Sequence, residues 1–205
     1  MIPAYWHDAA RALAKRDAVL KKLVKAYPEA NLRSRGNAFS TLARSITGQQ
    51  ISVKAAQSVW NRVAAAVGKM TPDNVLAKKD EELRACGLSW QKVSYIKDLA
   101  LHFQDGRIKP RRWAREDEET IIRELAEVKG IGRWTAEMFL MFYLLRPNVL
   151  PIDDIGLQRA MERHYNQGVT LSKDEMRKIA QCWEPWCTVA TWYMWRSLEA
   201  NPVIY

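Results

Sequence analysis

The sequence predicts an all-α protein, and three observations support this fold class. Apolar residues recur at three- to four-residue spacing through most of the 205-residue chain, as they do along the buried face of a helix. No segment of useful length shows the period-two alternation that is typical of a half-buried strand. Hydrophobic residues make up 48% of the chain, so it can bury a core as one large domain or two small lobes.

Cap residues and helix breakers set the bounds of the expected helices in the first half. The first helix runs from His7 to Tyr27, where Pro28 ends it because proline cannot continue a helix. Ser52 and Gly68 are suited to cap the two ends of another. The further helices expected in this half are 37–46, 52–67, 71–77, 79–85 and 89–105.

In the second half, two helices are expected on either side of a glycine-containing turn. They span 116–128 and 133–145, and the remaining apolar periodicity predicts three more helices. These cover 154–164, 172–183 and 185–200.

Charge points to a polyanionic partner. The formal net charge is +9 and the isoelectric point about 9.6, with lysine and arginine spread along the chain rather than gathered in a tail. A folded basic surface makes nucleic acid the first partner to consider. Charge alone leaves open a basic protein with no such partner.

The chain lacks the marks of a membrane or secreted protein. No apolar run approaches the roughly 20 residues that span a bilayer, and the polar N-terminal segment lacks the apolar stretch of a signal peptide. We therefore expect a cytoplasmic protein. Cys86, Cys182 and Cys187 are too few for a disulfide framework and have no neighbours at metal-ligand spacing, so they are expected to be core thiols.

The stretch Val128–Ala136, VKGIGRWTA, holds the glycine turn. Gly130 can adopt a positive φ at the end of the first helix, and Gly132 allows the backbone to come close to a ligand. Outward amides at the start of the next helix, flanked by Lys129 and Arg133, make an anion site that suits a phosphodiester. No strand precedes the turn, which excludes a P-loop. An ordinary helical hairpin with a glycine cap is the alternative.

Two adjacent acids, Asp153 and Asp154, follow the apolar run Val149–Pro151. One interpretation is an N-cap for the helix that follows. The other is a carboxylate beside a reacting sugar, where it would stabilise the positive charge that develops as an N-glycosidic bond breaks. The two interpretations are compatible, because a cap fixes the backbone that aims the acid.

The segment LAEVKGIGRWTA resembles the hairpin of the helix-hairpin-helix (HhH-GPD) DNA glycosylase superfamily. That family also carries a Gly/Pro-rich loop and an essential aspartate after the hairpin, and Asp154 follows Gly132 by 22 residues here. The resemblance implies a two-lobed helical fold with the active-site cleft between lobes, one lobe spanning 33–144 and the other 1–32 plus 145–205. It implies that Asp154 is catalytic, that Asp153 supports it, and that the DNA backbone is held by Lys129, Gly130, Ile131, Gly132 and Arg133.

Trp134 occupies the position where strand-cleaving members of this superfamily carry a catalytic lysine. An indole nitrogen is not a usable nucleophile, so the resemblance implies base removal without strand cleavage. The pattern GIGRWTA is similar to that of the alkylpurine glycosylases, the 3-methyladenine DNA glycosylase II type.

Aromatic side chains suit such a substrate, because an alkylated purine is a flat cation. The chain has nine tryptophans, four of them in CWEPWCTVATWYMW, and most are expected to be core or interface residues. By similarity Trp195 is a pocket residue, and Trp134 is a second wall. Met138 and Ile155 stand where some relatives have aromatic residues, which leaves the range of substrates open, hypoxanthine and 1-methyladenine included.

The stretch Ser45–Ser52, SITGQQIS, joins two expected helices and resembles the minor-groove loop of this subfamily. A flipped base leaves a hole in the duplex, which Gln50 could fill with its stem and amide, assisted by Gln49 and Ser52. An interhelix loop without such a role is the alternative.

The resulting hypothesis is a monomeric, monofunctional glycosylase that acts on double-stranded DNA with alkylated bases, in the cytoplasm and at the nucleoid in a bacterium. It needs no cofactor or side-chain metal site, although relatives often bind a monovalent cation through hairpin carbonyls. The alternative is a non-catalytic helix-hairpin-helix DNA-binding module, which would not need Asp154 or an aromatic pocket. An iron–sulfur glycosylase is disfavoured by the three scattered cysteines and by Trp134.

Overall fold

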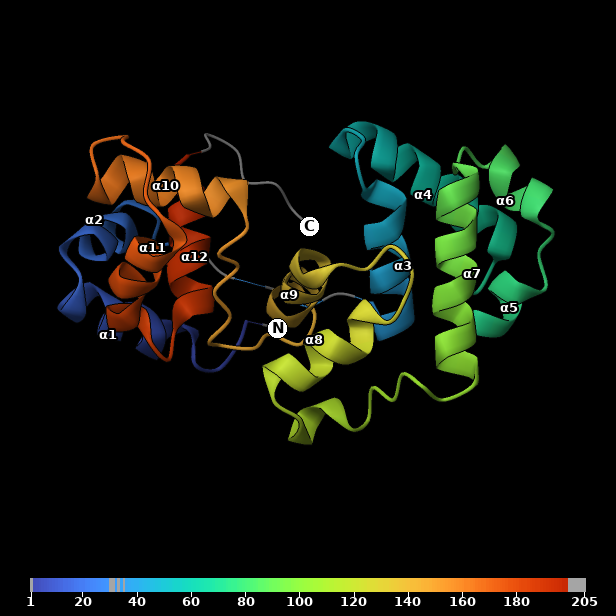
Figure 1. Cartoon of the computed structure of the whole chain (residues 1–205), viewed down its shortest axis with the longest axis horizontal. Helices are drawn as coiled ribbons and strands as arrows, with labels where there is room; N and C mark the ends of the chain where they lie inside the picture. The colour runs from blue at the N-terminus through green and yellow to red at the C-terminus, as the bar shows by residue number, and fades with distance from the viewer. Residues whose placement is uncertain (1, 30–31, 33, 35, 199–205) are drawn as a thin grey trace. The chain divides into compact units, whose positions relative to one another are not determined.

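The computed structural model describes residues 2–29, 32, 34 and 36–198, and over these residues it contains helices and no strand (Figure 1). The all-α prediction is confirmed. Two predicted bounds, the lobe boundary at Arg33 and the last helix's end at Ala200, lie outside the described residues. The chain forms two compact units, 1–34 with 140–205 and 35–139.

The first unit is built around α12, Cys187–Arg196, which packs against α1, α2 and α10 (Figure 1). Its core is rich in large side chains, with Trp6, Leu13 and Trp183 almost fully buried. The other elements of this unit are α1 Trp6–Arg16, α2 Ala18–Ala26, α10 Ile155–Tyr165, α11 Lys173–Ala180 and the 3₁₀ turn Gln181–Trp183.

The N-terminal segment forms two helices where the sequence predicted one. The break is at Asp17, whose extended backbone ends α1 and whose carboxylate accepts the N–H groups of Val19 and Leu20 at 2.8 and 2.9 Å. The same carboxylate accepts the hydroxyl of Tyr165 at 2.6 Å, and burial raises the pKa of that hydroxyl. An N-cap bound to the core therefore overrides the continuous apolar periodicity.

The second unit is organised by α7, Trp90–Gln104, which packs against α3, α5 and α6 (Figure 1). Leu42, Ile96 and Leu99 are fully buried there, and Trp113 packs edge-on against Phe139. The division between the units falls within α9, Arg133–Phe142. The other elements are α3 Ala38–Gly48, α4 Val53–Val67, α5 Pro72–Leu76, α6 Asp80–Ala85, the 3₁₀ turn Trp113–Arg115 and α8 Glu118–Ala126.

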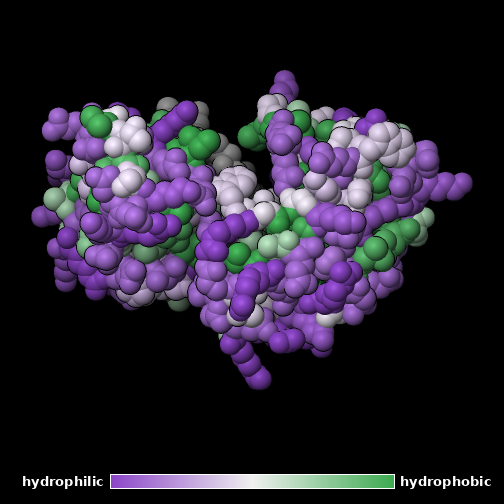
Figure 2. Space-filling view, viewed as in Figure 1, coloured by the Kyte–Doolittle hydropathy of each residue, from purple (hydrophilic) through white to green (hydrophobic). Residues whose placement is uncertain are grey.

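The cysteines depart in part from expectation. Cys86 and Cys187 are buried, and burial raises the pKa of Cys187 to about 12. Cys182 is exposed, so the prediction of a core thiol is wrong at this position: it lies in the 3₁₀ turn that follows α11, where the next residue, Trp183, is the one that enters the core. Hydrophilic side chains cover most of the face of each unit seen in Figure 2. Among the described residues, no helix is long and apolar enough to cross a membrane.

Candidate active site and nucleic-acid interface

Asp154 is the N-cap of α10, and its carboxylate is held in one orientation. Oδ1 accepts the N–H of Leu157 at 2.7 Å and the indole Nε1–H of Trp195, also at 2.7 Å. The Asp154 N–H donates to the carbonyl of Pro151 at 2.9 Å, which closes the turn before the helix. Both side-chain bonds end on the same oxygen, so the position of Oδ1 is set by the helix start and by α12.

Trp195 is fixed in turn by its neighbours in the same unit. Its ring stacks on Phe142 with centroids 5.9 Å apart and an interplanar angle of 12°. A Cβ at position 156 would lie 3.0 Å from Asp154 Oδ1 and 3.1 Å from the Trp195 ring, so the close approach of these two side chains requires Gly156. The motifs in the sequence do not single out Phe142 or Gly156.

The loop before Asp154 is tied to the start of α12. The buried Thr188 donates its hydroxyl to the carbonyl of Arg146 at 2.6 Å and accepts the N–H of Val149 at 3.0 Å. Its own N–H donates to the carbonyl of Pro147 at 3.0 Å. Thr188 of α12 therefore fixes the backbone of the loop that precedes Asp154.

Asp153, the predicted helper, is placed differently from Asp154. Its carboxylate forms an ion pair with Lys173, the first residue of α11, and both side chains are about half exposed. An exposed pair of this kind contributes little to stability. The two adjacent acids therefore differ in environment: one is fixed by two N–H donors, the other is an exposed partner of a lysine.

The glycine turn joins α8 to α9 and has a tightly packed side. Gly130 has a φ of 82°, and a Cβ there would lie 2.1 Å from the ring of Tyr95. Ile131 is buried, so the turn is anchored in the core of its unit. Gly132 differs, because a Cβ at that position would have no other atom within 4 Å, and the residue is exposed. The positive φ expected at Gly130 is observed.

The two basic residues of the hairpin have different partners. The backbone N–H of Lys129 donates to Asp98 Oδ2 at 2.8 Å, while its side chain is exposed. Arg133 pairs with Glu119 and donates to Glu137 at 3.0 Å, and the hydrogen bonds to Glu119 raise the pKa of its guanidinium. Much of the Arg133 charge is therefore compensated within the protein. The Ile131 N–H donates to the carbonyl of Val128 at 3.0 Å, so this amide does not point outward as the sequence predicted. The Lys129 side chain and the hairpin amides other than those of Lys129 and Ile131 are the stronger candidates for binding a phosphate.

The other predicted pocket residues are distributed over both units. Trp134 lies in the first turn of α9 with 37% of its surface exposed, whereas Met138, one turn later, is buried in its unit. Ile155, the first residue of α10, is 62% exposed. Trp195 is the predicted pocket residue that contacts the predicted catalytic carboxylate.

The predicted wedge loop lies between α3 and α4. Gln50 is exposed and has a φ of 58°, an uncommon backbone conformation for a non-glycine residue. Gln49 is partly buried, and its Nε2 donates to the carbonyl of Gly130 at 2.8 Å. Ser52 caps α4 by accepting the N–H of Ala55 at 3.3 Å, and the adjacent Ile51 and Val53 are exposed apolar residues.

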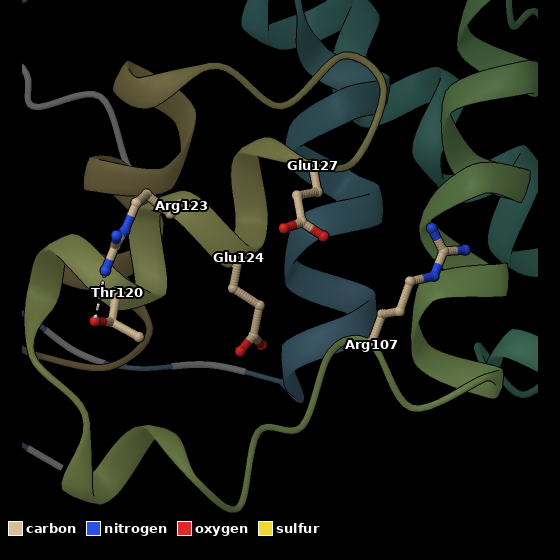
Figure 3. Close-up of a pocket in the computed structure, with 5 residues that line it drawn as sticks. All are labelled: Arg107, Thr120, Arg123, Glu124 and Glu127. Atoms are coloured by element: carbon tan, nitrogen blue, oxygen red, sulfur yellow. Dashed lines mark hydrogen bonds between the residues drawn. The ribbon is translucent and has the colours of Figure 1, made fainter.

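A hollow on the second unit does not resemble a base pocket. Figure 3 shows side chains of both charge signs around it, and Arg123 there donates to the Thr120 hydroxyl at 3.2 Å. No aromatic side chain lines it; its lining residues are Arg107, Thr120, Arg123, Glu124 and Glu127. Among the described residues, no group of three or more His, Cys, Asp and Glu side chains could hold a metal ion.

The chain is similar in sequence to proteins that are already known. A family model described as "HhH-GPD superfamily base excision DNA repair protein" matches residues 43–185. A relative from Schizosaccharomyces pombe, DNA-3-methyladenine glycosylase 1, is 31% identical over 182 residues, which cover 87% of this chain and 80% of the relative. The chain spans 59% of the length of a Bacillus subtilis relative that it also matches.

Two solved structures are similar over nearly the whole chain. A crystal structure of DNA-3-methyladenine glycosidase from Bacillus halodurans has a TM-score of 0.85 and 34% identity, covering 94% of this chain and 89% of that one. The S. pombe 3-methyladenine DNA glycosylase Mag1, solved in complex with abasic DNA, has a TM-score of 0.78 and 30% identity, covering 96% and 100%.

Proposed function

Because the chain belongs to the HhH-GPD superfamily of base excision DNA repair proteins, we propose that it is a monofunctional DNA glycosylase for alkylated purines. It flips bases of the 3-methyladenine and 7-methylguanine kind out of duplex DNA and hydrolyses the N-glycosidic bond. The observation that carries this proposal is the carboxylate of Asp154, held at the start of α10 by the N–H groups of Leu157 and Trp195.

In the proposed reaction the bond between C1′ of the deoxyribose and the purine nitrogen breaks, and the purine leaves with the electron pair. Positive charge then develops on the sugar, and the Asp154 carboxylate stabilises it. A water molecule bonds to C1′ and loses a proton, which the same carboxylate can accept. The two N–H donors orient the carboxylate before the substrate arrives, so little reorganisation is needed during the reaction.

The leaving group explains why no strong general acid is required. An alkylated purine such as 3-methyladenine already carries positive charge, and it becomes neutral as it leaves. The site must bind a flat cation, which the electron-rich faces of aromatic side chains do well. Trp134 and Trp195 are the proposed aromatic contacts, with Met138 and Ile155 as the other predicted walls.

Trp134 also supports the absence of strand cleavage. It occupies the first turn of α9, where strand-cleaving members of the superfamily carry a lysine, and its indole cannot form a Schiff base. The proposal needs no cofactor, and a monovalent cation at the hairpin would be held by its backbone carbonyls. We also propose that the protein acts as a monomer in the cytoplasm, and at the nucleoid in a bacterial cell.

The decisive experiment is incubation of the wild-type protein with methylated duplex DNA, followed by measurement of free 3-methyladenine and 7-methylguanine. We expect both bases to be released, and borohydride added during the reaction should trap no covalent protein–DNA adduct. A strand-cleaving glycosylase acting on its own substrate serves as the control for trapping. Binding without base release would instead support the non-catalytic DNA-binding module, and a robust adduct would contradict the proposed role of Trp134.

A further inference from the structure

Two loops of the second unit that are far apart in the sequence are directly bonded to each other. The first is the wedge loop, defined here as residues 47–52, and the second is the hairpin turn, residues 128–132. The Gln49 amide of the wedge loop donates to the carbonyl of Gly130 at 2.8 Å, across 81 positions of sequence. Gln49 thus points its functional group at the protein, whereas its neighbour Gln50 is exposed.

Lys92 holds the wedge loop from the other side. Its Nζ donates to the carbonyls of Thr47 at 2.8 Å and Gln49 at 2.7 Å, at the C-terminal end of α3. A cation is favoured there because it offsets the unpaired carbonyls and the partial negative charge of a helix end. Burial lowers the pKa of this amine, so the position has a cost that an exposed lysine would avoid.

The same face of α7 also holds the hairpin turn. Lys92, Tyr95 and Asp98 follow one another at three-residue spacing, which places them on one side of the helix. The ring of Tyr95 packs where a Cβ of residue 130 would lie, and Asp98 accepts the N–H of Lys129 at 2.8 Å. One helical face therefore contacts both loops.

We propose that Gln49 and Lys92 are positioning residues that join the wedge loop and the hairpin turn into one pre-organised DNA-binding surface, from which Gln50 alone enters the duplex. This inference rests on the proposed function for its consequences in base flipping, but the coupling of the loops is a property of the free protein. The inference changes the role predicted for Gln49. This residue holds the hairpin turn in place, and only Gln50 fills the space left by a flipped base.

The coupling can be measured without DNA by amide hydrogen exchange of the hairpin segment 127–135. Gln49→Met keeps the length of the side chain but removes the N–H donor, and Gln49→Asn keeps the amide on a stem too short to reach Gly130. Loss of one net hydrogen bond should speed exchange of the hairpin amides by about five- to tenfold in each variant. The matched control, Gln50→Ala, should exchange like the wild type in that segment.

Binding to undamaged duplex DNA provides the second readout. A pre-organised surface increases the affinity for any duplex, damaged or not. Gln49→Met and Lys92→Met should therefore both weaken binding to undamaged DNA by about five- to tenfold. Gln50→Ala should bind undamaged DNA within about twofold of the wild type, because a wedge acts only after flipping, and should instead slow excision of a paired lesion. Lys92→Arg, which restores a cation with several donors, should recover most of the lost affinity.

The inference is overturned if Gln49→Met and Gln49→Asn leave both hairpin exchange and affinity for undamaged DNA at wild-type values. It is equally overturned if Gln49→Met behaves like Gln50→Ala, with normal affinity for undamaged DNA and slow excision of paired lesions only. Failure of the proposed function would give a different result. The wild type would then release no base, but substitution of Gln49 would still speed hydrogen exchange in the hairpin.

Discussion

Asp154 shows how one residue can be both a helix cap and a candidate catalytic group. Its Oδ1 caps α10 through Leu157 and binds the indole of Trp195, so the structural role supplies the orientation that the chemistry needs. Asp153 is next in sequence but pairs with Lys173 on the surface. The resemblance to known glycosylases favoured Asp154 of the two acids, and the geometry gives a physical reason for that preference.

Trp195→Phe tests whether the indole orients the carboxylate. Phenylalanine retains an aromatic ring to pack on Phe142 but removes the N–H that donates to Asp154. We expect the excision rate constant under single-turnover conditions to fall by about ten- to a hundredfold, because a hydrogen bond to a charged group contributes about 1.5–3 kcal/mol. The loss of the same bond should lower the free energy of unfolding in urea by about 1.5–3 kcal/mol.

The matched control is Trp186→Phe, which removes the indole of a residue that stacks on Tyr5 with centroids 5.7 Å apart. Because this indole packs on Tyr5 rather than on Phe142 beside the carboxylate, its loss should leave the excision rate close to that of the wild type. Equal rates for Trp195→Phe and Trp186→Phe would show that the indole of Trp195 does not orient the catalytic group.

At the scale of elements, local sequence signals were sufficient to find most helices. Ser52 caps α4 and Gly68 ends it, as the sequence predicted, and Ser89 caps α7. Such signals depend on residues within one or two turns, so they can be recognised without tertiary structure. The break at Asp17 was missed, because its strength depends on bonds to Tyr165 and Trp183, far along the chain.

The supporting contacts of the candidate site could not be predicted for the same reason. The bond from Trp195 to Asp154 spans 41 positions and that from Gln49 to Gly130 spans 81. No local pattern encodes either of them, and each depends on how helices pack. Motif resemblance located the candidate residues, whereas the roles of Lys92 and Gly156 emerged only from the folded arrangement.

The two glycines of the hairpin should differ in how much stability is lost when each is replaced by alanine. Gly130→Ala introduces a Cβ at positive φ and within 2.1 Å of the Tyr95 ring, so it should lower the free energy of unfolding by about 2–4 kcal/mol. Gly132→Ala meets nothing within 4 Å and should change this free energy by less than about 1 kcal/mol. Urea unfolding measures both, and equal stabilities of the two variants would refute the packing argument.

At the scale of the whole molecule, the net charge of +9 implies salt-dependent DNA binding. About four phosphate contacts would give a slope of about −3.6 in log K against log salt, or roughly a hundredfold loss of affinity between about 50 and 200 mM salt. Fluorescence anisotropy with undamaged duplex DNA measures this slope. Lys129→Ala should reduce its magnitude by about one, and an affinity independent of salt would contradict electrostatic binding.

The proposed function depends most of all on Asp154 acting as the catalytic carboxylate of a DNA glycosylase. The most direct test compares wild type, Asp154→Asn and Asp153→Asn in single-turnover release of 7-methylguanine from duplex DNA. Asparagine caps a helix about as well as aspartate, so Asp154→Asn should fold, and Asp153→Asn should fold because it removes only an exposed ion pair. Both variants should bind abasic DNA with nearly wild-type affinity.

Asp154→Asn should release the base at least about 10²- to 10³-fold more slowly, because it removes the charge that stabilises the developing cation. Asp153→Asn should remain within about threefold of the wild-type rate, because its ion pair with Lys173 is exposed. A wild-type rate of 7-methylguanine release from Asp154→Asn would contradict the catalytic role of this carboxylate.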